Sequence, residues 1–444
     1  MKLILLSLLT GALLYLAFSK YELWLFAFPA LYMLLRNTNS HFWLLSGFFF
    51  FFLSLRCANI ASIDYGGVPP LLSYSIFTLF VLFLALYQFL LPAWINRKLF
   101  KGSPYAAVLL YVLFELLRSY VPYGGFPWLI LGSLLVYVPL LKHSLLYANV
   151  YVQSLLLLSA VAFIITRKRL QLLVLFFLWT FLSLLAVYEK REALKHAQRI
   201  KVALVQTAVE QADKLDRERF KKHTEEVLRL VEKAVEGRPH LVLLPESAFA
   251  FFYSEEEDEG NYRLKSLSFS VPILVGLIDI REGLKPYNSA YLLKDGYAAD
   301  YYDKVRLLPV GEYMPYPFGF LKDIFSAISG MDYVPGDRIK PLRYGYVRVA
   351  TPICFEVAYY DMVRRLSREA NLIVVLTNDG WFKDSDCTHQ HFLWARVRAL
   401  ENGKYVLWLN NTGDTGVVDM DGNVLASLPY MKRAVLFMEV PLLE

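Results

Sequence analysis

The first 188 of the 444 residues are too apolar to form a soluble domain. They contain seven apolar segments, and a membrane-spanning helix needs roughly 20 mostly apolar residues. The segments cover residues 3–18, 22–35, 41–61, 71–95, 104–121, 144–165 and 170–188. We therefore predict a multi-span α-helical membrane domain over residues 1–188. Met1-Lys2 before an apolar run is also typical of a signal peptide, but a signal anchor is simpler because further spans follow at once.

Charge is spread unevenly, and this predicts an orientation. Residues 1–188 hold 12 Lys and Arg but 3 Asp and Glu, whereas the rest of the chain holds 34 basic and 37 acidic residues. With seven spans, the basic clusters at 97–101 and 167–169 fall on the same side as Lys2 and Arg36. Cytoplasmic loops are rich in Lys and Arg, so we expect residues after 188 to lie outside the cytoplasm. The basic excess reports topology, not nucleic-acid binding.

Two polar features interrupt the apolar half. Glu115 and Arg118 are three residues apart on one predicted helix and can pair on one face. A structural ion pair is one interpretation, and a functional role is the other, because charged residues within spans are costly. The loop at 123–128 ends in Gly125-Phe126-Pro127-Trp128. It lies on the predicted outer side, where Trp and Tyr favour the interface, although it can also be an ordinary turn.

After a polar, charged linker at 190–201, short apolar strands alternate with polar helical patterns. This alternation predicts an α/β layered domain over residues 189–444. The three cysteines, Cys57, Cys354 and Cys387, are too few and too scattered for a disulfide framework or a zinc site. His389 and His391 have no third ligand beside them, so we expect no metal. The sequence also has no glycine-rich phosphate loop, and we expect no cofactor.

Three residues in this half can together perform acyl transfer. Glu246, Lys304 and Cys354 each follow a strand-like run. The carboxylate can take the thiol proton as a general base, and the thiolate can then attack an acyl carbon to form a thioester. The ammonium and a backbone N–H can stabilise the tetrahedral oxyanion. A cysteine alone is more often a small buried hydrophobe, so the prediction depends on the three residues together.

These residues stand in motifs that resemble the nitrilase, or carbon–nitrogen hydrolase, superfamily. The motifs are Leu-Pro-Glu at 244–246, Tyr-Asp-Lys-Val-Arg-Leu-Leu-Pro-Val-Gly-Glu at 302–312 and Ile-Cys-Phe-Glu at 353–356. The resemblance implies that Glu246, Lys304 and Cys354 form a catalytic Glu-Lys-Cys triad. It also implies an α-β-β-α sandwich for residues of about 200–444.

The chain further resembles the apolipoprotein N-acyltransferase branch, which joins this domain to a multi-span N-terminal half. The motifs are Gly-Phe-Pro-Trp at 125–128, Asn-Asp-Gly-Trp-Phe at 378–382, His-Gln-His at 389–391 and Arg-Ala-Leu-Glu at 398–401. This resemblance implies transfer of an acyl chain from a membrane phospholipid to the N-terminal amine of the diacylglyceryl-cysteine of a lipoprotein, through a Cys354 thioester. It implies a multi-pass protein of the bacterial cytoplasmic (inner) membrane with a periplasmic catalytic domain.

Further residues carry over to the predicted site. Glu312 and Glu356 resemble the family's additional carboxylates, and Phe355 follows the nucleophile; structural salt bridges are the alternative for the two carboxylates. The candidate substrate- and lipid-binding residues are aromatic: Trp128, Phe251, Phe252, Tyr316, Phe318 and Trp381. We expect the stretches 249–253 and 314–320 to be mobile arms that touch the bilayer. Ordinary domain core is the alternative for these stretches and for Trp381.

Some positions depart from the family pattern. Leu215 occupies a loop position where the family usually has Trp, and Phe355 stands where Tyr is frequent. Ser133 and Leu135 replace a polar pattern after the 125–128 motif. Many members end in a further spanning helix, whereas only short apolar runs precede Glu444. These departures concern lipid entry and C-terminal topology rather than the triad.

Two other functions share parts of this pattern. A membrane-anchored amidase or nitrilase would have the same triad, but one span is enough for an anchor. A non-catalytic scaffold would have no need of an intact Glu-Lys-Cys set. The acyltransferase interpretation accounts for both the triad and the multi-span half, because a lipid acyl donor explains why the two are joined.

Overall fold

The structure is a computed structural model, and it describes all residues except 282, 323 and 325–331. It forms two compact units. The first comprises residues 1–64, 68–188 and 385–393, and the second comprises 65–67, 189–384 and 394–444. The main division therefore follows Tyr188, where the apolar segments end. The short piece 385–393 is the exception, because it comes from the C-terminal half of the sequence and packs within the first unit.

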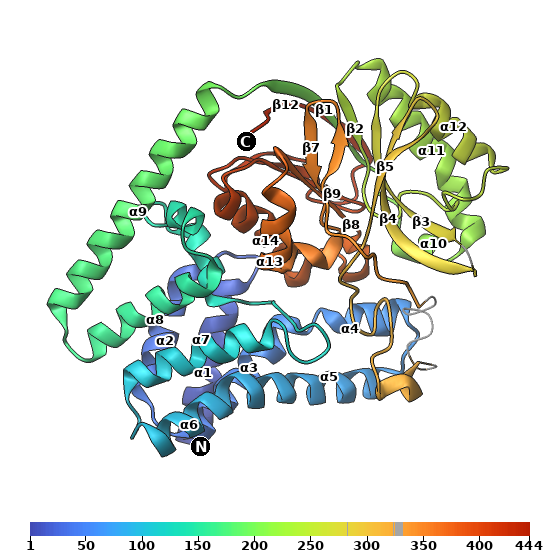
Figure 1. The fold of residues 1–444 in the computed structure, drawn as a ribbon. Helices are drawn as coiled ribbons and strands as arrows, with labels where there is room; N and C mark the ends of the chain where they lie inside the picture. Colours follow the sequence, from blue (N-terminus) through green and yellow to red (C-terminus); the bar gives the residue numbers. More distant parts are fainter. Residues whose placement is uncertain (282, 323, 325–331) are drawn as a thin grey trace. The chain divides into compact units, whose positions relative to one another are not determined.

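The first unit is helical (Figure 1). Its helices are α1 (Lys2–Phe18), α2 (Ala27–Arg36), α3 (Ser40–Leu55), α4 (Ala58–Ile60), α5 (Pro70–Ala85), α6 (Leu91–Leu99), α7 (Pro104–Arg118), α8 (Val150–Ile165) and most of α9 (Arg169–Lys195). The segment predicted from residue 144 becomes α-helical only at Val150. The reason is local: the Asn149 side chain accepts hydrogen bonds from the N–H groups of Tyr151 and Val152 and so caps α8.

By length and composition, two helices within the described residues can cross a membrane, Pro70–Leu99 and Arg169–Lys195. The pair Ser40–Leu55 and Ala58–Tyr65, bent by 53°, is a third candidate. Three shorter apolar helices are Lys2–Phe18, Trp24–Arg36 and Val150–Ile165. The structure therefore has helices at the predicted apolar segments, while the number of crossings stays a prediction.

Glu115 and Arg118 both hold the loop that follows α7. Arg118 donates hydrogen bonds to the carbonyls of Phe126 (2.6 Å) and Trp128 (2.7 Å), and Glu115 accepts one from the N–H of Leu131 (2.9 Å). Both side chains are buried, Glu115 at 0% and Arg118 at 2% exposure. Buried charges need such partners. The pair therefore has a structural role in fixing the 126–131 loop.

The expectation about cysteines was wrong in one respect. Cys57 and Cys387 form a disulfide within the first unit, with a Cα–Cα distance of 6.0 Å and a sequence separation of 330 residues. Spacing along the chain could not reveal this pair, because the bonding distance arises only when residues 385–393 fold into the helical unit. Cys354 is the remaining free cysteine.

The second unit contains two six-stranded sheets. The first has the strand order β12-β1-β2-β3-β4-β5, and the second has the order β11-β10-β9-β8-β7-β6. The strands of the first sheet are β1 (Arg199–Gln206), β2 (Leu241–Leu243), β3 (Ile273–Arg281), β4 (Lys285–Lys294), β5 (Tyr297–Asp303) and β12 (Ala434–Pro441). Those of the second are β6 (Leu342–Tyr344), β7 (Val347–Ala350), β8 (Leu372–Thr377), β9 (Val406–Asn410), β10 (Gly416–Val418) and β11 (Val424–Ser427).

Helices cover the sheets, which gives the predicted α-β-β-α layering (Figure 1). The helices beside the first sheet are α10 (Gln211–Lys214), α11 (Arg217–Glu236) and α12 (Glu259–Leu267), and those beside the second are α13 (Tyr360–Ser367) and α14 (Asp386–Asn402). Helix α11 is amphipathic, and Asp216 caps its start by accepting from the N–H groups of Glu218 and Arg219. Its apolar face lies on the sheet.

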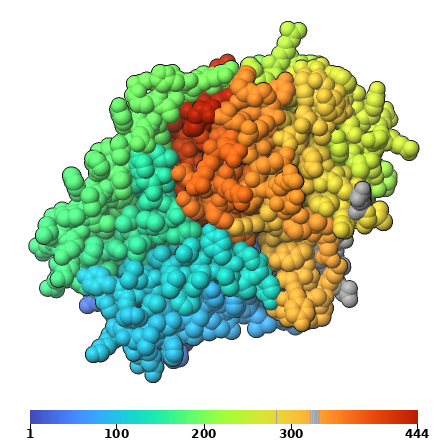
Figure 2. Space-filling view, viewed as in Figure 1, coloured from blue at the N-terminus to red at the C-terminus, as the bar shows by residue number. Residues whose placement is uncertain are grey.

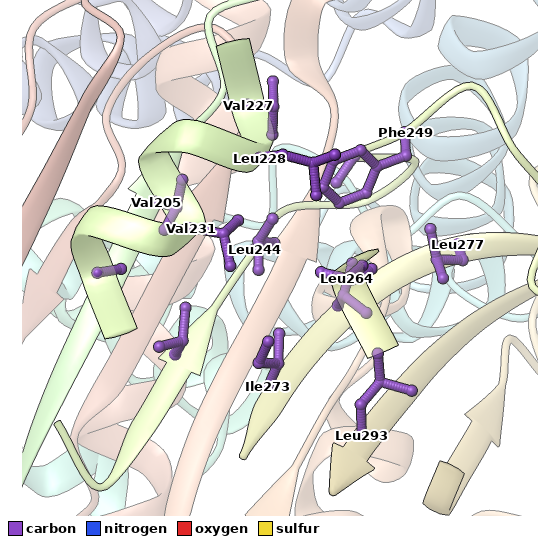
Figure 3. Close-up of a cluster of buried hydrophobic side chains, with 14 of the residues drawn as sticks. Val205, Val227, Leu228, Val231, Leu244, Phe249, Leu264, Ile273, Leu277 and Leu293 are labelled. Atoms are coloured by element: carbon purple, nitrogen blue, oxygen red, sulfur yellow. The ribbon is translucent and has the colours of Figure 1, made fainter. Parts of the chain in front are cut away.

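Figure 3 shows this core. Val227, Leu228 and Val231 of α11 belong to one buried cluster with Leu244 and Ile273, and all five are at most 2% exposed. Burying one such side chain contributes roughly 1.5–3 kcal/mol. The core fixes the sheet and thereby the strand ends where the predicted catalytic residues stand.

The predicted linker at 190–201 is partly helical. Helix α9 continues to Lys195, and β1 begins at Arg199. Lys190 is 3% exposed and donates a hydrogen bond of 2.6 Å to the carbonyl of Met420, within the second unit. A run of charged residues suggested a solvated linker, but the aliphatic part of a Lys side chain can be buried while its ammonium finds a partner.

Candidate active site

The candidate catalytic residues follow strands of the two sheets of the second unit. Strands β1, β2 and β3 run parallel, as do β7, β8 and β9, so their carboxyl ends gather at one edge of each sheet. Glu246 follows β2, and Cys354 follows β7. Functional residues often stand at such strand ends, because the sheet holds the backbone rigidly while the side chain remains accessible.

Glu246 is held by a close approach of two backbones. The N–H of Gly276 on β3 donates to the carbonyl of Pro245 (3.2 Å), and the N–H of Ala248 donates to the carbonyl of Gly276 (3.0 Å). A Cβ atom at position 276 would lie 2.6 Å from the Cα of Glu246. Only glycine permits this contact. Glu246 is 7% exposed.

Lys304 lies between two carboxylates. Its Nζ donates to Glu312 Oε1 at 2.8 Å and lies 3.8 Å from Glu246 Oε1. The amide of Asn288 joins the same carboxylates, since its Nδ2 donates to Glu246 Oε1 (2.7 Å) and to Glu312 Oε1 (3.0 Å). Glu312 Oε2 accepts from the N–H of Leu308 (2.7 Å). The predicted catalytic residues Glu246 and Lys304 are therefore brought together, with Glu312 as the direct partner of the lysine.

Cys354 opens a tight turn. Its φ is +52°, in the left-handed region that residues other than glycine rarely adopt, and it begins the short 3₁₀ helix η7 (Cys354–Ala358). Such strain is found at catalytic turns when the surrounding structure holds it. Arg398, which is fully buried, donates hydrogen bonds of 2.7 Å to the carbonyls of Val357 and Ala358. It also pairs with Glu401.

Glu356 connects the nucleophile turn to the lysine loop. One oxygen accepts from the N–H groups of Val305 (2.7 Å) and Arg306 (2.9 Å), and the other accepts from the N–H of Ile353 (2.8 Å). The hydroxyl of Tyr302 donates to the same carboxyl group. Burial raises the pKa of Glu356 to about 7, while Lys304 and the backbone donors act in the opposite direction. Glu356 is thus a structural link between the loops that carry Cys354 and Lys304.

The three predicted catalytic residues, Glu246, Lys304 and Cys354, are electrostatically coupled. Burial raises the pKa of the Cys354 thiol well above its ordinary value, Glu246 and Asp379 add to this, and Lys304 and a hydrogen bond with Thr377 oppose it. Burial also raises the pKa of Glu246, which Lys304 counteracts. Burial alone would lower the pKa of Lys304, but Glu312, Cys354 and Glu246 outweigh it and raise that pKa. The resting site therefore favours a protonated thiol beside a charged ammonium.

Lys214 is a second lysine whose charge interacts with that of Glu246. The Nζ of Lys214 donates to the carbonyl of Ser247 (2.8 Å), one residue after Glu246. Burial lowers the pKa of Lys214 to about 7, and the charge of Glu246 opposes this change. The next residue, Leu215, is 44% exposed. Sequence reasoning singled out Leu215 and missed both Lys214 and Asn288, because neither stands in a motif by itself.

The predicted aromatic arms differ from each other. Phe251 is 2% exposed and belongs to the core cluster of the first sheet, and Phe252 is partly buried against Arg217. For the stretch 249–253 the structure therefore favours the domain-core alternative. In contrast, Tyr316 is 90% and Phe320 is 74% exposed. Their light-orange segment lies on the surface of the second unit (Figure 2).

The other predicted aromatic residues are placed as follows. Phe318, in the exposed segment, is 39% exposed. Trp381, in η8 (Asp379–Phe382), is partly buried and makes an edge contact with Tyr65 at 6.0 Å. Phe355 is 8% exposed. Trp128 belongs to the first unit, where its Nε1 donates to Gln390 (2.8 Å).

Among the residues that the structure describes, no group of three or more His, Cys, Asp or Glu side chains is arranged to hold a metal ion. The donors and acceptors around Cys354 suit proton transfer and oxyanion stabilisation. Such an arrangement can form and resolve a thioester with the protein's own side chains.

Comparisons with known proteins show similarity over both halves of the chain. A carbon–nitrogen hydrolase family model matches residues 201–443, and a model of the apolipoprotein N-acyltransferase N-terminal domain matches residues 10–163. The first match confirms the nitrilase-like fold predicted for the second half. Among solved structures, an amidase from Nesterenkonia sp. AN1 is 22% identical, with a TM-score of 0.43 over 55% of this chain and 92% of the amidase. Saccharomyces cerevisiae Nit3 is 21% identical, with a TM-score of 0.42 over 55% of this chain and 90% of Nit3.

Curated relatives match nearly the whole chain. The apolipoprotein N-acyltransferase of Aquifex aeolicus is 43% identical over 97% of this chain and 97% of its own length. That of Haemophilus ducreyi is 28% identical over 98% of this chain and 90% of its own length. Identity at this level across both halves shows the family. The chain belongs to the apolipoprotein N-acyltransferase family, a family of acyltransferases within the carbon–nitrogen hydrolases.

Proposed function

We propose that this protein transfers an acyl chain from a membrane phospholipid to the N-terminal amine of the diacylglyceryl-cysteine of a lipoprotein. Glu246, Lys304 and Cys354 form the catalytic triad of this proposal. The observation that carries it is the pairing of Lys304 with Glu246 and Glu312, at 3.8 and 2.8 Å, next to a strained cysteine turn. The first unit consists of apolar helices, two or three of which are long enough to cross a membrane, and this supports a lipid as the acyl donor.

In the first step Glu246 removes the thiol proton while the Cys354 sulfur attacks the ester carbonyl of the phospholipid. The C–S bond forms, and the carbonyl electrons move onto oxygen. The Lys304 ammonium and a backbone N–H beside the cysteine stabilise that oxyanion. When the tetrahedral intermediate collapses, the ester C–O bond breaks and Glu246 returns its proton to the leaving lysophospholipid. A thioester on Cys354 remains.

In the second step the lipoprotein's N-terminal amine attacks the thioester. Glu246 accepts a proton from the amine, and the tetrahedral oxyanion again meets the Lys304 ammonium. The C–S bond breaks, an amide forms, and the proton returns to the sulfur. Each step leaves the total charge of the site unchanged. This suits a buried site, because an unbalanced charge is costly there.

We propose that residues after 188 lie on the periplasmic side of the cytoplasmic membrane of a bacterium. Two observations support this orientation. Basic residues cluster at 97–101 and 167–169, which would then face the cytoplasm. The Cys57–Cys387 disulfide is also typical of an oxidising compartment, because cytosolic thiols are kept reduced.

The exposed segment 314–320 is proposed to touch the bilayer. Tyr316 and Phe320 expose 90% and 74% of their surface, and large aromatic side chains are costly to expose to water unless they bind a partner. Protease protection tests this proposal. Vesicles should protect the segment from cleavage, and equal cleavage rates with and without lipid would contradict the contact.

Trapping the acyl-enzyme tests the reaction. The purified full-length protein in detergent is incubated with phospholipid that carries a labelled acyl chain. We expect label on the protein that neutral hydroxylamine releases and that Cys354→Ala abolishes. A matched control is Cys57→Ser/Cys387→Ser, which removes two sulfurs and leaves the nucleophile. Label that survives Cys354→Ala, or no label with intact lipid, would contradict the proposed nucleophile or donor.

A further inference from the structure

The end of β5 presents different side chains on its two faces. Successive side chains of a strand point to opposite faces, so Tyr302 and Lys304 share one face and Asp303 lies on the other. On the first face the Tyr302 hydroxyl donates to Glu356, and Lys304 Nζ donates to Glu312 at 2.8 Å. This is the face of the candidate active site.

The neighbouring strand β4 shows the same alternation. Ser289 stands opposite Asp303 in the antiparallel ladder. The N–H of Lys304 donates to the carbonyl of Asn288 (2.9 Å), so the pairing continues one residue past the end of β5. Asn288 and Lys304 both donate to Glu312, at 3.0 and 2.8 Å. One face therefore carries the two donors of the candidate active site, and the opposite face carries Ser289 and Asp303.

Arg281, the last residue of β3, holds this opposite face. Its Nη1 and Nη2 donate to the two oxygens of Asp303 at 2.7 and 2.9 Å, which is a bidentate arrangement. Nη2 also donates to the Tyr291 hydroxyl (2.9 Å), and Nε donates to Asp279 (2.8 Å). The hydroxyl of Ser289 donates to Asp303 at 2.6 Å. These hydrogen bonds join β3, β4 and β5 directly behind Lys304.

Aromatic rings cover the Arg281 guanidinium. Its Cζ lies 4.5 Å from the ring centre of Tyr287 and 4.7 Å from that of Tyr301. The Arg281 side chain is 28% exposed and that of Asp303 is 12% exposed. Without Arg281 the Asp303 carboxylate would therefore be left largely buried without its cation, and such a loss is costly.

The register of β4 and β5 needs a contact of this kind. The ladder shifts between Leu292 and Leu293, close to the turn, where Ala299 is an extra residue in β5. A slip of one residue moves every side chain of a strand to the opposite face. Such a slip would turn Lys304 away from its two carboxylates and put Asp303 in its place.

We propose that Arg281 is a positioning residue that, through Asp303, fixes the register in which β5 presents Lys304 to the candidate active site. This inference rests on the proposed catalytic role of Lys304. Arg281 acts from the opposite face of the sheet, so its loss misplaces the ammonium and leaves the lipid-binding surface intact. A displacement of a catalytic group by about 1 Å can cost about 100-fold in rate.

The kinetic test uses the full-length protein in detergent with phospholipid that carries a labelled acyl chain, below the melting temperature of every variant. Arg281→Gln should lower the maximal rate of acyl-enzyme formation about tenfold or more and leave the half-saturating lipid concentration unchanged. Arg263→Gln is the matched control and should keep the wild-type rate. Arg263 also pairs with two carboxylates, Glu225 and Glu232, but these contacts join α12 to α11.

A double-mutant cycle tests whether Arg281 acts through Asp303. Asp303→Asn alone should lower the maximal rate by a similar factor, and its combination with Arg281→Gln should lower it little further, because each variant breaks the same pair. Effects that multiply in the double variant would contradict this route. An unchanged maximal rate in Arg281→Gln, or an equal fall in Arg263→Gln, would overturn the proposal.

Hydrogen exchange followed by mass spectrometry needs no lipid and separates this inference from the proposed reaction. The Lys304 N–H is bonded to the carbonyl of Asn288, so its exchange reports the pairing of β4 with β5. Arg281→Gln should exchange about tenfold faster over residues 297–305 and at the wild-type rate over β1. Unchanged exchange over 297–305 would contradict the inference. If the wild type formed no acyl-enzyme, the proposed reaction would fail, and faster exchange over 297–305 would still support the role of Arg281.

Discussion

Lys304 donates a hydrogen bond of 2.8 Å to Glu312, and this contact is shorter than its approach to Glu246 at 3.8 Å. The lysine is therefore held by a carboxylate outside the proposed triad. Glu246 keeps a looser contact with the ammonium, which suits its proposed role in proton exchange with Cys354. Glu312 also accepts from Asn288 and Leu308, so one carboxylate organises the whole lysine loop.

Replacing Glu312 with Gln tests this organisation. We expect acyl-enzyme formation to slow by about 100-fold or more. The Lys304 ammonium would lose its nearest negative charge, and the new Gln side-chain nitrogen would face a hydrogen-bond donor, either Lys304 Nζ or the N–H of Leu308. The rate of acyl-enzyme formation is measured by quenching the reaction with labelled phospholipid at successive times and counting the label on the protein. Glu225→Gln is the matched control. Glu225 also pairs with a cation, Arg263, but it lies on α11, away from Lys304. Equal rates for the two variants would contradict the assigned role.

Asn288→Asp should alter the pH dependence of acylation. The change replaces a donor by a third carboxylate beside Glu246 and Glu312. A nearby negative charge disfavours ionisation of Glu246 and raises its pKa, so the acidic limb of the rate profile should move to higher pH. The measurement is the acylation rate across the pH range. Asn423→Asp on the exposed turn after β10 serves as the control and should leave the limb in place. A limb that moves to lower pH would be inconsistent with the charge argument.

Asp414→Asn should stabilise the protein above about pH 6. Burial, with Asp379 and Asp384 adding to it, raises the pKa of Asp414 from 3.8 to about 6. Folding then takes up a proton between these values, so stability is full at low pH and falls as pH rises through that window. A pKa that differs by one between the folded and unfolded states corresponds to about 1.4 kcal/mol, which sets an upper bound of roughly 3 kcal/mol on this effect.

The melting temperature at two pH values measures this effect. We expect Asp414→Asn to melt higher than the wild type at a pH of about 7.5 and equally at a pH of about 3.5, on either side of the window. Position 414 has φ +56°, which Asn tolerates, so the substitution adds no backbone strain. Asp295→Asn is the control, because Asp295 has a similar φ of +53° but lies exposed in a hairpin. An increase in the melting temperature of Asp414→Asn that is the same at both pH values would exclude a charge effect.

The disulfide predicts a thiol count. Without reductant, a maleimide reagent of high mass should modify one cysteine of the denatured protein, and with reductant it should modify three. In the Cys354→Ala variant, the reagent should modify no cysteine without reductant and two cysteines with reductant. Samples quenched in acid directly from cells make the count a test of compartment. Three reactive thiols without reductant would contradict both the disulfide and the proposed orientation. Loss of the bond by Cys57→Ser/Cys387→Ser should cost about 2–4 kcal/mol.

Strand patterns and local motifs were sufficient to predict the layered α/β domain and to place the proposed triad residues after strands. Glu246 and Cys354 follow the mostly buried strands β2 and β7, which stand out in the sequence as short apolar runs. Lys304 follows β5, in which exposed and less exposed residues alternate. Helix starts were predicted less well. The Asn149 cap that delays α8 was present in the sequence, but the apolar run around it favoured an earlier start.

Contacts between distant residues were not predictable from the sequence. Asn288 stands in the middle of β4 and has no motif around it, yet it joins two catalytic-site carboxylates from different loops. Cys57 and Cys387 are 330 residues apart, and their pairing depends on residues 385–393 folding with the helical unit. Phe251 and Tyr316 both stand in aromatic runs, but only the fold distinguishes a core residue from an exposed one.

The most direct test of the account follows a labelled acyl chain from Cys354 to an acceptor. The isolated acyl-enzyme is mixed with a diacylated lipopeptide that has a free N-terminal amine, and in parallel with the same lipopeptide acetylated at that amine. The account predicts that label moves to the free amine as a hydroxylamine-stable amide and stays on the protein with the acetylated peptide. Label released into water at equal rates in both reactions would contradict N-acyl transfer and favour a hydrolase.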